Sequence, residues 1–394
     1  MPKLNISMSS PDLTDLERAS VQRVMHTTTL SIGREIELFE DKIRKYIGLP
    51  FAAGVNSGTS GLHLCVIASG VRENDAVITT PFSFIASTNA ILYERGIPVF
   101  IDVDERTGNI NPDVVAQAVY DLKNGHEKSW LPPSFRISHS QFRTLKAILP
   151  VHAFGQPVDM DPINEIAHNN NLIVIEDACE ALGSEYKGQK AGLLSDAAVF
   201  AFYPNKQITT GEGGMIVTRH EQWDKLFRSL RNQGRDEFNG WLNHNRLGYN
   251  YRMDELSAAL GAVQMQRVDE LLAKRAQVAQ WYNERLANVE SIQVPYIHPD
   301  TTRMSWFVYV VRILPPLNRD RIITELHKHG IPSRPYFTPI HLQPFYRRQF
   351  GYSEGDFPVT EKLGRISLAL PFSSIMTADE VDYVCDKLLQ ALNK

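Results

Sequence analysis

The sequence has few cysteines, and none of them forms a pair with the spacing of metal ligands. Cys65, Cys179 and Cys385 are the three cysteines in 394 residues, and they lie far apart. We therefore expect neither a disulfide framework nor a zinc cluster. The twelve histidines include no HExxH pattern, so no metal site is predicted.

Long apolar runs and an excess of one charge are also missing. No run reaches the roughly 18 apolar residues of a membrane-spanning helix, and the polar stretch 1–20 has no signal-peptide core. The formal net charge is −4, from 41 basic and 45 acidic residues. Such a balance gives no reason to expect a nucleic acid or an anionic membrane as a partner. Together these absences predict a cytoplasmic enzyme in a reducing compartment.

The chain does contain enough apolar residues for a large core. Hydrophobic residues make up 43% of the sequence, and its length fits two domains. Strands are predicted at 51–57, 75–81, 97–104, 145–152, 172–179, 197–203 and 214–219, and helices at 58–70 and 82–96. Because these strands lack polar alternation, they predict an α/β fold with a mostly parallel sheet covered by helices on both faces.

The pattern changes after residue 252. A long helix is predicted over 253–286, where Asp254 and Glu255 suit the helix start. The segments that follow are predicted as a strand at 306–314, a helix at 318–330, a loop rich in proline and aromatics at 331–346 and a helix at 377–392. We therefore predict a large domain over 1–252 and a smaller α+β domain over 253–394, joined by the long helix.

One polar segment, 119–144, interrupts the alternation and contains Pro132-Pro133. It is predicted to be a surface insertion, and a lid or an interface arm is the alternative.

The stretch VNSGTSG suits an anion site. A predicted strand ends at Asn56, and Gly58, Thr59 and Ser60 open the next helix. Exposed amides at a helix start, helped by the helix dipole, bind phosphate. An ordinary Ser/Thr helix cap is the alternative. The dinucleotide fingerprint GxGxxG is absent, and no P-loop lysine follows.

A second candidate feature is the carboxylate pair at the end of an apolar strand. The run LIVIEDAC places Glu176 and Asp177 at its C-terminal end. Ligands of open α/β sheets bind at that edge. A carboxylate there can hold a protonated ring nitrogen in a charge-assisted hydrogen bond. A helix-capping aspartate is the alternative.

A lysine on the next strand completes the set. Lys206 follows an apolar run and precedes the small residues of TTGEGG, which let backbone approach a flat ligand. A lysine amine can attack a carbonyl to form a Schiff base, although a solvated lysine is the alternative. Phe84, placed after another strand, can stack on a ring or pack in the core. An anion cradle, a ring-nitrogen acid and a lysine on one sheet together indicate pyridoxal phosphate as the cofactor.

Taken in order, these motifs resemble those of the DegT-type nucleotide-sugar aminotransferases, which are pyridoxal phosphate enzymes of fold type I, the aspartate-aminotransferase-like fold. The resemblance covers nearly the whole chain. It begins at TTTLSIGREIELFEDKIRKYIG and includes VNSGTSGLHL, TTPFSFIASTNAI, VIEDACEALGSEYKG, FYPNKQITTGEGGMIVT, LGYNYRMDELSAALG and LALPFSSIMTADEVDYV. So many matches in order are more specific than any single motif.

The resemblance implies roles for individual residues. Lys206 is expected to hold the cofactor covalently, and Asp177 to pair with the pyridine nitrogen. The phosphate is expected to lie on Gly58, Thr59 and Ser60.

Further positions follow from the same resemblance, with two departures from the family pattern. Phe84 is expected to stack on the ring, and Asn250 to reach across a homodimer to the phosphate of the neighbouring chain. Glu180 stands where the family often has glutamine touching the ring hydroxyl. Ala201 stands where the family tends to have a serine that contacts phosphate.

The implied reaction is a ping-pong transamination. L-glutamate donates the amino group, the freed Lys206 amine moves the proton, and a nucleotide-linked keto-sugar accepts the amino group. The form TTGEGG resembles members that aminate C4 of a 4-keto-6-deoxy sugar. Arg334, Tyr336 and His341 are candidates for binding the nucleotide sugar, in surface polysaccharide, lipopolysaccharide or a related glycan pathway.

Three other functions are alternatives to this one. Sugar dehydratases of the same fold carry histidine at the lysine position, so Lys206 favours transamination. A non-catalytic regulator with a pyridoxal fold has no need of the lysine, the aspartate and the phosphate cradle. A dehydrogenase on a doubly wound sheet needs the glycine fingerprint that this chain lacks.

Overall fold

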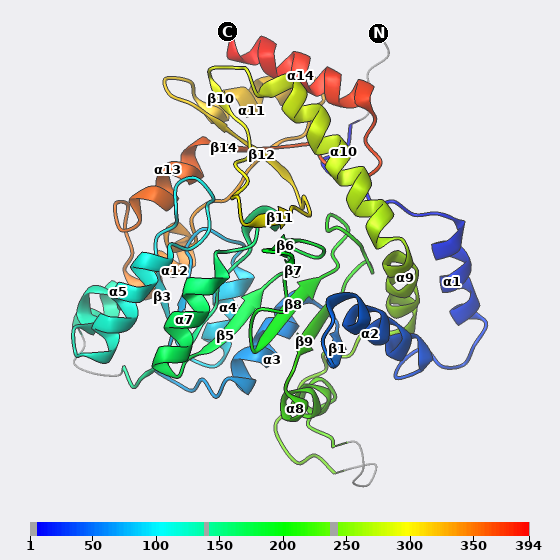
Figure 1. Ribbon diagram of the computed structural model, residues 1–394, viewed down its shortest axis with the longest axis vertical. Coiled ribbons are helices and arrows are strands. Elements are labelled where there is room, and N and C mark those ends of the chain that lie inside the picture. Colours follow the sequence, from blue (N-terminus) through cyan, green and yellow to red (C-terminus); the bar gives the residue numbers. More distant parts are fainter. Residues whose placement is uncertain (1–5, 138–141, 237–242, 394) are drawn as a thin grey trace.

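The computed structural model describes residues 6–137, 142–236 and 243–393. Seven strands form its central sheet (Figure 1), in the order β1-β9-β8-β5-β4-β2-β3. They are β1 (Phe51–Val55), β2 (Ala76–Thr79), β3 (Ile97–Phe100), β4 (Leu145–Ile148), β5 (Ile173–Asp177), β8 (Ala197–Ala201) and β9 (Gly214–Thr218). Each lies within one of the seven predicted strand segments. β9 is antiparallel to β1 and β8, and the other neighbours are parallel, so the predicted mostly parallel sheet is confirmed.

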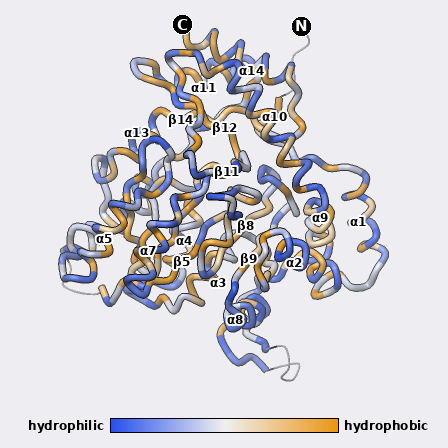
Figure 2. Tube along the Cα trace, in the orientation of Figure 1, coloured by the Kyte–Doolittle hydropathy of each residue, from blue (hydrophilic) through white to orange (hydrophobic). Residues whose placement is uncertain are grey.

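Helices cover both faces of this sheet, as predicted. One face carries α2 (Arg34–Ile47), α5 (Pro112–Lys123), α7 (Met160–Asn170) and α9 (Glu255–Gln266). The other carries α3 (Gly58–Ala68), α4 (Ala86–Tyr93) and α8 (Glu221–Arg231). The outer helices show mixed hydrophilic and hydrophobic colouring in Figure 2, as expected of helices with one buried side. The described residues include no helix that is long and apolar enough to span a bilayer.

Helix α3 packs unusually close to the sheet because it carries Gly61. A Cβ on Gly61 would lie 2.7 Å from Cγ1 of Val199 and 3.3 Å from Cγ1 of Ile216. Only a glycine lets the helix backbone approach strands β8 and β9 this closely. This contact fixes the N-terminal end of α3 above the C-terminal end of β8.

The C-terminal part of the chain builds a second, antiparallel sheet, at the top of Figure 1. Its order is β10-β12-β14-β13. The strands are β10 (Ile292–Gln293), β12 (Tyr309–Ile313), β13 (Arg334–Pro335) and β14 (Ser367–Leu370). The same part of the chain forms the helices α10 (Val268–Leu286), α11 (Arg319–Lys328), α12 (Pro344–Phe350), α13 (Pro358–Ile366) and α14 (Ala378–Leu392), of which α12 packs beside Phe100 of β3. The core between this sheet and α10, α11 and α14 is built from aromatic and aliphatic residues, including Tyr282, Tyr309 and Phe372.

A small sheet connects the two parts, and short elements complete the fold. β11 (Thr301–Arg303) pairs with β6 (Glu185–Tyr186), which also pairs with β7 (Gln189–Lys190). The remaining elements are α1 (Asp15–Met25), α6 (Pro133–Ile137) and the short turns η1 (Glu127–Ser129), η2 (Ala153–Gly155) and η3 (Ile340–Leu342).

The single long helix predicted over 253–286 is wrong, because the chain forms two helices. The backbone of Arg267 has φ −101° and ψ 5°, outside the helical range, and it separates α9 from α10. The Arg267 guanidinium bonds to the carboxylates of Asp12 and Glu17, at 2.8 Å and 2.7 Å. Asp254 does cap α9 as expected, since its side chain accepts from the Ser257 amide at 2.9 Å.

Two segments for which no helix or strand is predicted, the expected surface insertion 119–144 and the expected loop 331–346, contain regular structure. In 119–144, the first residues end α5, and α6 follows, with Leu122 and Leu131 buried. Residues 138–141 of that segment lie outside the described residues. The expected loop 331–346 contains β13, η3 and the start of α12. These elements are short and contain prolines, so their apolar residues do not repeat often enough to show a helix or strand period.

Candidate active site

A cavity of about 670 Å³ opens beside the N-terminal end of α3 and the C-terminal end of β5. Its walls come from the turns after β1 and β5, the loop between β8 and β9, the start of α4 and the segment around β13. Its volume is within the range of small-molecule and cofactor sites. Ala201 lines it, and so do seven of the residues predicted to bind or react: Gly58, Thr59, Phe84, Asp177, Glu180, Lys206 and Tyr336.

The start of α3 presents backbone amides to this cavity. Ser57 caps the helix, and its Oγ accepts from the Ser60 amide at 3.1 Å. The amides of Gly58 and Thr59 have no hydrogen-bond partner among the described residues. Free amides at the positive end of an α-helix form an anion site. The predicted cradle is therefore open for a phosphate at these two residues.

Gly58 keeps this cradle open because a side chain there would collide with the wall. An added Cβ would lie 2.7 Å from Cβ of Ala201 and 2.9 Å from Sγ of Cys179. Ala201, at the end of β8, thus packs directly under the helix start. It presents a methyl group to the cavity where the family tends to have a hydroxyl.

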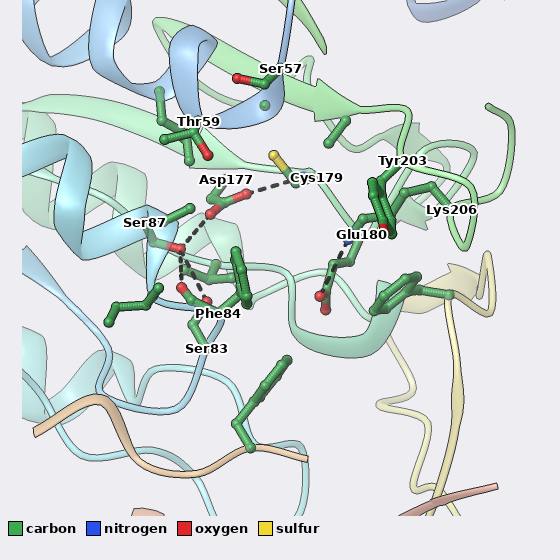
Figure 3. Close-up of a pocket in the computed structure, with 18 of the residues that line it drawn as sticks. Ser57, Thr59, Ser83, Phe84, Ser87, Asp177, Cys179, Glu180, Tyr203 and Lys206 are labelled. Carbon is green, nitrogen blue, oxygen red and sulfur yellow. Dashed lines mark hydrogen bonds and ion pairs between the residues drawn. The ribbon is translucent and has the colours of Figure 1, made fainter. Parts of the chain in front are cut away.

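Asp177 occupies the end of β5 and is held in one orientation. Its Oδ2 accepts from Oγ of Ser87 at 2.6 Å, and its Oδ1 accepts from the Cys179 amide at 3.1 Å (Figure 3). The side chain is 5% exposed and lines the cavity. Two donors fix the carboxylate plane without a cationic partner, so the carboxylate can still accept from a ligand donor.

Burial of the neighbouring Cys179 thiol raises its pKa well above the ordinary range, and the Asp177 carboxylate adds to the shift. The thiol therefore stays neutral and acts as a packing group of the wall.

Lys206 lies in the loop between β8 and β9 and points into the cavity. Its Nζ lies 3.6 Å from Oε1 of Glu180 and 3.8 Å from the ring centroid of Phe307 (Figure 3 shows the Glu180 contact). Its side chain is 13% exposed. Lys206 is thus a mostly buried amine between a carboxylate and an aromatic ring, and the solvated-lysine alternative does not describe it.

The carboxyl group of Glu180 interacts electrostatically with the Lys206 amine. Its Oε2 accepts from the Phe154 amide at 2.9 Å. Burial raises the pKa of Glu180, and the positive charge of Lys206 only partly offsets the effect of burial. A carboxyl group with a raised pKa, 3.6 Å from an amine, is placed to exchange protons with that amine.

Aromatic rings line the remaining walls. Phe84 is 63% exposed and lines the cavity rather than packing in the core, which favours its stacking role over the alternative. Tyr203 is also exposed at the cavity, while Tyr336 stacks on Phe154 with ring centroids 6.4 Å apart. Exposed aromatic faces at the edge of a pocket suit a flat ring or a sugar.

Ser60 is predicted to bind the phosphate of its own chain and Asn250 that of a neighbouring chain, and neither residue lines the cavity described here. Ser60 does not line the cavity, because its Oγ donates to Oδ1 of Asn56 at 2.6 Å and its amide is used by the cap. Asn250 is exposed outside the cavity, with its carbonyl accepting from Nδ2 of Asn56 at 3.3 Å. The expectation for Asn250 concerned the neighbouring chain of a dimer.

Of the three residues expected to bind the nucleotide sugar, one lines the cavity and two do not. Tyr336 lines the cavity, whereas Arg334 is exposed just before the lining residue Pro335. His341 is 0% exposed and bonds Oε1 of Glu361 at 3.1 Å, outside the cavity lining. Its position does not favour a direct substrate contact, because η3 turns the imidazole into the protein.

Sequence reasoning missed several lining residues. Ser87 and Cys179 lie in the motifs TTPFSFIASTNAI and VIEDACEALGSEYKG, but their spacing in the sequence does not show that their hydroxyl and amide groups bond to Asp177. Phe307 belongs to the C-terminal part of the chain and has no local signal. Among the described residues, no group of three or more His, Cys, Asp or Glu side chains is arranged to hold a metal ion.

The residues of the cavity fit pyridoxal phosphate. The unpartnered amides of Gly58 and Thr59 match its phosphate, and the glycine at 58 leaves room that a Cβ would fill. The oriented carboxylate of Asp177 matches a protonated ring nitrogen, and the Lys206 amine matches an aldehyde. Phe84 offers a ring face.

Comparison with known proteins agrees with this fit. The DegT/DnrJ/EryC1/StrS aminotransferase family matches residues 11–389. The chain belongs to that family. The GDP-perosamine synthase of Caulobacter vibrioides is 39% identical over 391 residues, covering 98% of each chain. The spore coat polysaccharide biosynthesis protein SpsC of Bacillus subtilis is 33% identical over 391 residues, covering 96% of this chain and 95% of SpsC.

A solved structure gives the same result for the fold. A protein from Streptococcus pneumoniae described as a sugar aminotransferase, Spr1654, matches in its PMP form with a TM-score of 0.88 and 25% identity, covering 99% of each chain. This member of the DegT/DnrJ/EryC1/StrS family is therefore a pyridoxal phosphate-dependent aminotransferase, and it belongs with the sugar aminotransferases of nucleotide-sugar biosynthesis. The predicted family, fold class, cofactor and enzyme class are confirmed.

Proposed function

We propose that this aminotransferase moves the amino group of L-glutamate to C4 of a nucleotide-linked 4-keto-6-deoxy sugar, for a surface polysaccharide or a related glycan. The observation that carries the proposal is the meeting of the α3 amides, Asp177 and Lys206 in one cavity with aromatic walls. The relative named GDP-perosamine synthase supports a nucleotide sugar as the acceptor. The presence of lysine rather than histidine at 206 favours transamination over dehydration.

When bound, pyridoxal phosphate supplies an aldehyde carbon that joins an amine and a ring that accepts the electron pair of a broken C–H bond. We assign the phosphate to the amides of Gly58 and Thr59, and the ring face to Phe84. Asp177 holds the proton on the ring nitrogen, which keeps the ring able to accept electrons. The Ser87 hydroxyl orients Asp177 for that contact.

Lys206 holds the cofactor between turnovers and then carries the proton. With the donor bound, the Lys206 amine would be the base that takes the proton from the α-carbon of the donor and the acid that gives the proton back. Glu180, 3.6 Å away, is placed to exchange a proton with that amine. The mostly buried setting of Lys206 excludes much of the water that competes for this proton.

We further propose that the working enzyme is a homodimer with shared active sites. Among the described residues that line the cavity, Lys206 is the one cation, against the carboxylates of Asp177, Glu180 and Glu212. L-glutamate and a nucleoside diphosphate both bring negative charge, so further cationic or polar groups are needed. Asn250 is exposed outside its own cavity and is free to reach the phosphate of a second chain.

The half-reactions test the substrates directly. L-glutamate should bleach the visible absorption band of the purified enzyme without any partner protein, and a nucleotide-linked 4-keto sugar should restore it. A panel of 3-keto and 4-keto sugars on UDP, dTDP and GDP then identifies the acceptor. Restoration by a 3-keto sugar alone contradicts C4 amination, and no bleaching by L-glutamate contradicts the proposed donor.

Hybrid dimers test the shared site. If Asn250 serves the neighbouring chain, a mixture of Lys206→Ala and Asn250→Ala chains, unfolded together and refolded, contains hybrids with one intact site. Random pairing then restores about a quarter of the wild-type activity. A mixture no more active than its parents contradicts the shared site.

A further inference from the structure

Arg275, on α10, is a buried cation that the chemistry described above does not use. Its side chain is 1% exposed and points toward the loop that carries Lys206. It has no carboxylate partner among the described residues, although other buried arginines such as Arg267 do. Burial without an anion lowers the pKa of Arg275 to about 10. Burying a guanidinium without a counter-ion lowers the free energy of unfolding. The hydrogen bonds that Arg275 makes are therefore candidates for a functional role.

Those contacts are four backbone carbonyls from two separate segments. Nη2 donates to the carbonyl of Lys206 at 2.6 Å and to that of Asn205 at 3.3 Å. Nη1 donates to the carbonyls of Trp306 and Phe307, both at 3.1 Å. One planar group thus ties the Lys206 loop to the segment that leads into β12.

The two segments need such a connection because the first has no regular structure. Between β8 and β9, Lys206 lies in a turn, in which its amide donates to the carbonyl of Tyr203 at 2.9 Å. Phe307, on the second segment, places its ring 3.8 Å from Nζ of Lys206. Arg275 therefore holds the backbone of Lys206 and the backbone of Phe307, whose ring Lys206 faces.

A second contact joins the same segments beside the guanidinium. Nε2 of Gln207 donates to the Glu180 carbonyl at 2.5 Å and to Oγ of Ser305 at 2.8 Å. The backbone of Glu180, whose carboxyl group faces Lys206, is therefore tied to the same point as the lysine. With Arg275 in place, the relative positions of Lys206, Glu180 and Phe307 are fixed from outside the cavity.

We propose that Arg275 is a positioning residue, which holds the Lys206 backbone against Phe307 so that Nζ is aimed at the aldehyde carbon of the cofactor. The proposal rests on the covalent role assigned to Lys206. A lysine at 275 cannot replace the arginine, because its single nitrogen cannot span four carbonyls in a plane. Arg275 touches neither substrate nor cofactor, since it does not line the cavity.

The test compares Arg275→Lys with Arg285→Lys, an arginine on the same helix that bonds Asp382 and Asp386 near the surface. Cofactor-free protein is mixed with pyridoxal phosphate, and the rate of covalent capture is followed by the visible band and by borohydride trapping. We expect Arg275→Lys to capture the cofactor about tenfold more slowly, a cost of about 1.4 kcal/mol, with the control unchanged.

Amide hydrogen exchange separates positioning from general destabilisation. In Arg275→Lys, faster exchange should be confined to residues 203–209 and 305–308, while the rest of the chain keeps the wild-type pattern. Arg275→Gln carries the same comparison if the lysine variant does not fold. Wild-type capture rates, or faster exchange throughout the chain, overturn the proposal. Loss of the covalent link in the wild-type protein is a different result, and it overturns the role of Lys206 itself.

Discussion

Lys206 and Glu180 face each other inside the cavity, with Nζ 3.6 Å from Oε1 and both side chains mostly buried. The groups around this pair are Asp177 at the end of β5, Cys179 just after that strand, Tyr336 just after β13 and the Phe154 amide. A glutamine at 180, which the family often has, cannot take up or release a proton. The pair is therefore a feature that distinguishes this chain chemically.

Glu180→Gln should change how stability depends on pH. Burial raises the pKa of Glu180 above its ordinary range, so the folded chain holds this proton more tightly than the unfolded chain. Ionisation of Glu180 then lowers the free energy of unfolding as the pH rises through that raised value. The variant cannot ionise, so it should gain stability relative to the wild type as the pH rises, with the smallest difference in acid. Urea unfolding of cofactor-free protein, from about pH 4 to about pH 8, measures this. A difference that does not change with pH contradicts the prediction.

Gly58→Ala should close the phosphate cradle. The new Cβ collides with Ala201 and Cys179, which costs about 1–3 kcal/mol in the free energy of unfolding, and it displaces the helix start. We expect the Kd for pyridoxal phosphate to rise at least about tenfold. Gly61→Ala is the matched control, since its Cβ collides with Val199 beneath the same helix but away from the cavity. Equal loss of cofactor affinity in both variants would show that only the packing of α3 matters.

Ala201→Ser should strengthen phosphate binding. The added hydroxyl lies beside the Gly58 end of α3, and a hydrogen bond to a charged acceptor contributes about 1.5–3 kcal/mol. In a Lys206→Ala background, where binding is not covalent, the Kd for pyridoxal phosphate should fall about tenfold. Ala201→Cys adds similar volume with a weak donor and should fall short of this gain. Weaker binding by the serine variant than by the alanine parent would contradict the assignment of this wall to the phosphate.

Substitutions at Asp177 and Ser87 should have graded effects. Asp177→Asn removes the negative charge opposite the ring nitrogen, and we expect kcat to fall at least about a hundredfold. Ser87→Ala removes only the 2.6 Å hydrogen bond to Oδ2, so the fall should be smaller and should appear in kcat more than in KM. Stopped-flow measurement of the glutamate half-reaction gives both values. A larger effect at Ser87 than at Asp177 would contradict the proposed order of roles.

Much of the sheet and the centre of the site could be predicted because the signals are local. Unbroken apolar runs give the seven strands, and polar residues after them give the edge where Gly58, Asp177 and Lys206 meet. The order of the strands could not be obtained this way, because β9 inserts antiparallel between β1 and β8 through long-range pairing.

The parts that could not be predicted depend on contacts between distant segments. Arg275 and Phe307 contact the Lys206 loop from the C-terminal part of the chain. The spacing of residues in the sequence predicts neither the Arg275–Lys206 hydrogen bond nor the Phe307–Lys206 contact. His341 shows the reverse case: the residue type suits a ligand contact, but the side chain is buried and bonds Glu361. The break at Arg267 likewise follows from bonds to Asp12 and Glu17, far away in sequence.

The identity of the covalently modified residue tests the central claim most directly. The holoenzyme is reduced with borohydride and digested, and the labelled peptide is sequenced by mass spectrometry, with Lys206→Ala and the exposed-site variant Lys225→Ala treated alongside. We predict a single pyridoxyl label, on Lys206, which Lys225→Ala retains and Lys206→Ala lacks. We also expect Lys206→Ala to lose nearly all transamination activity. A label on another lysine, or a Lys206→Ala enzyme that turns over normally, would contradict it.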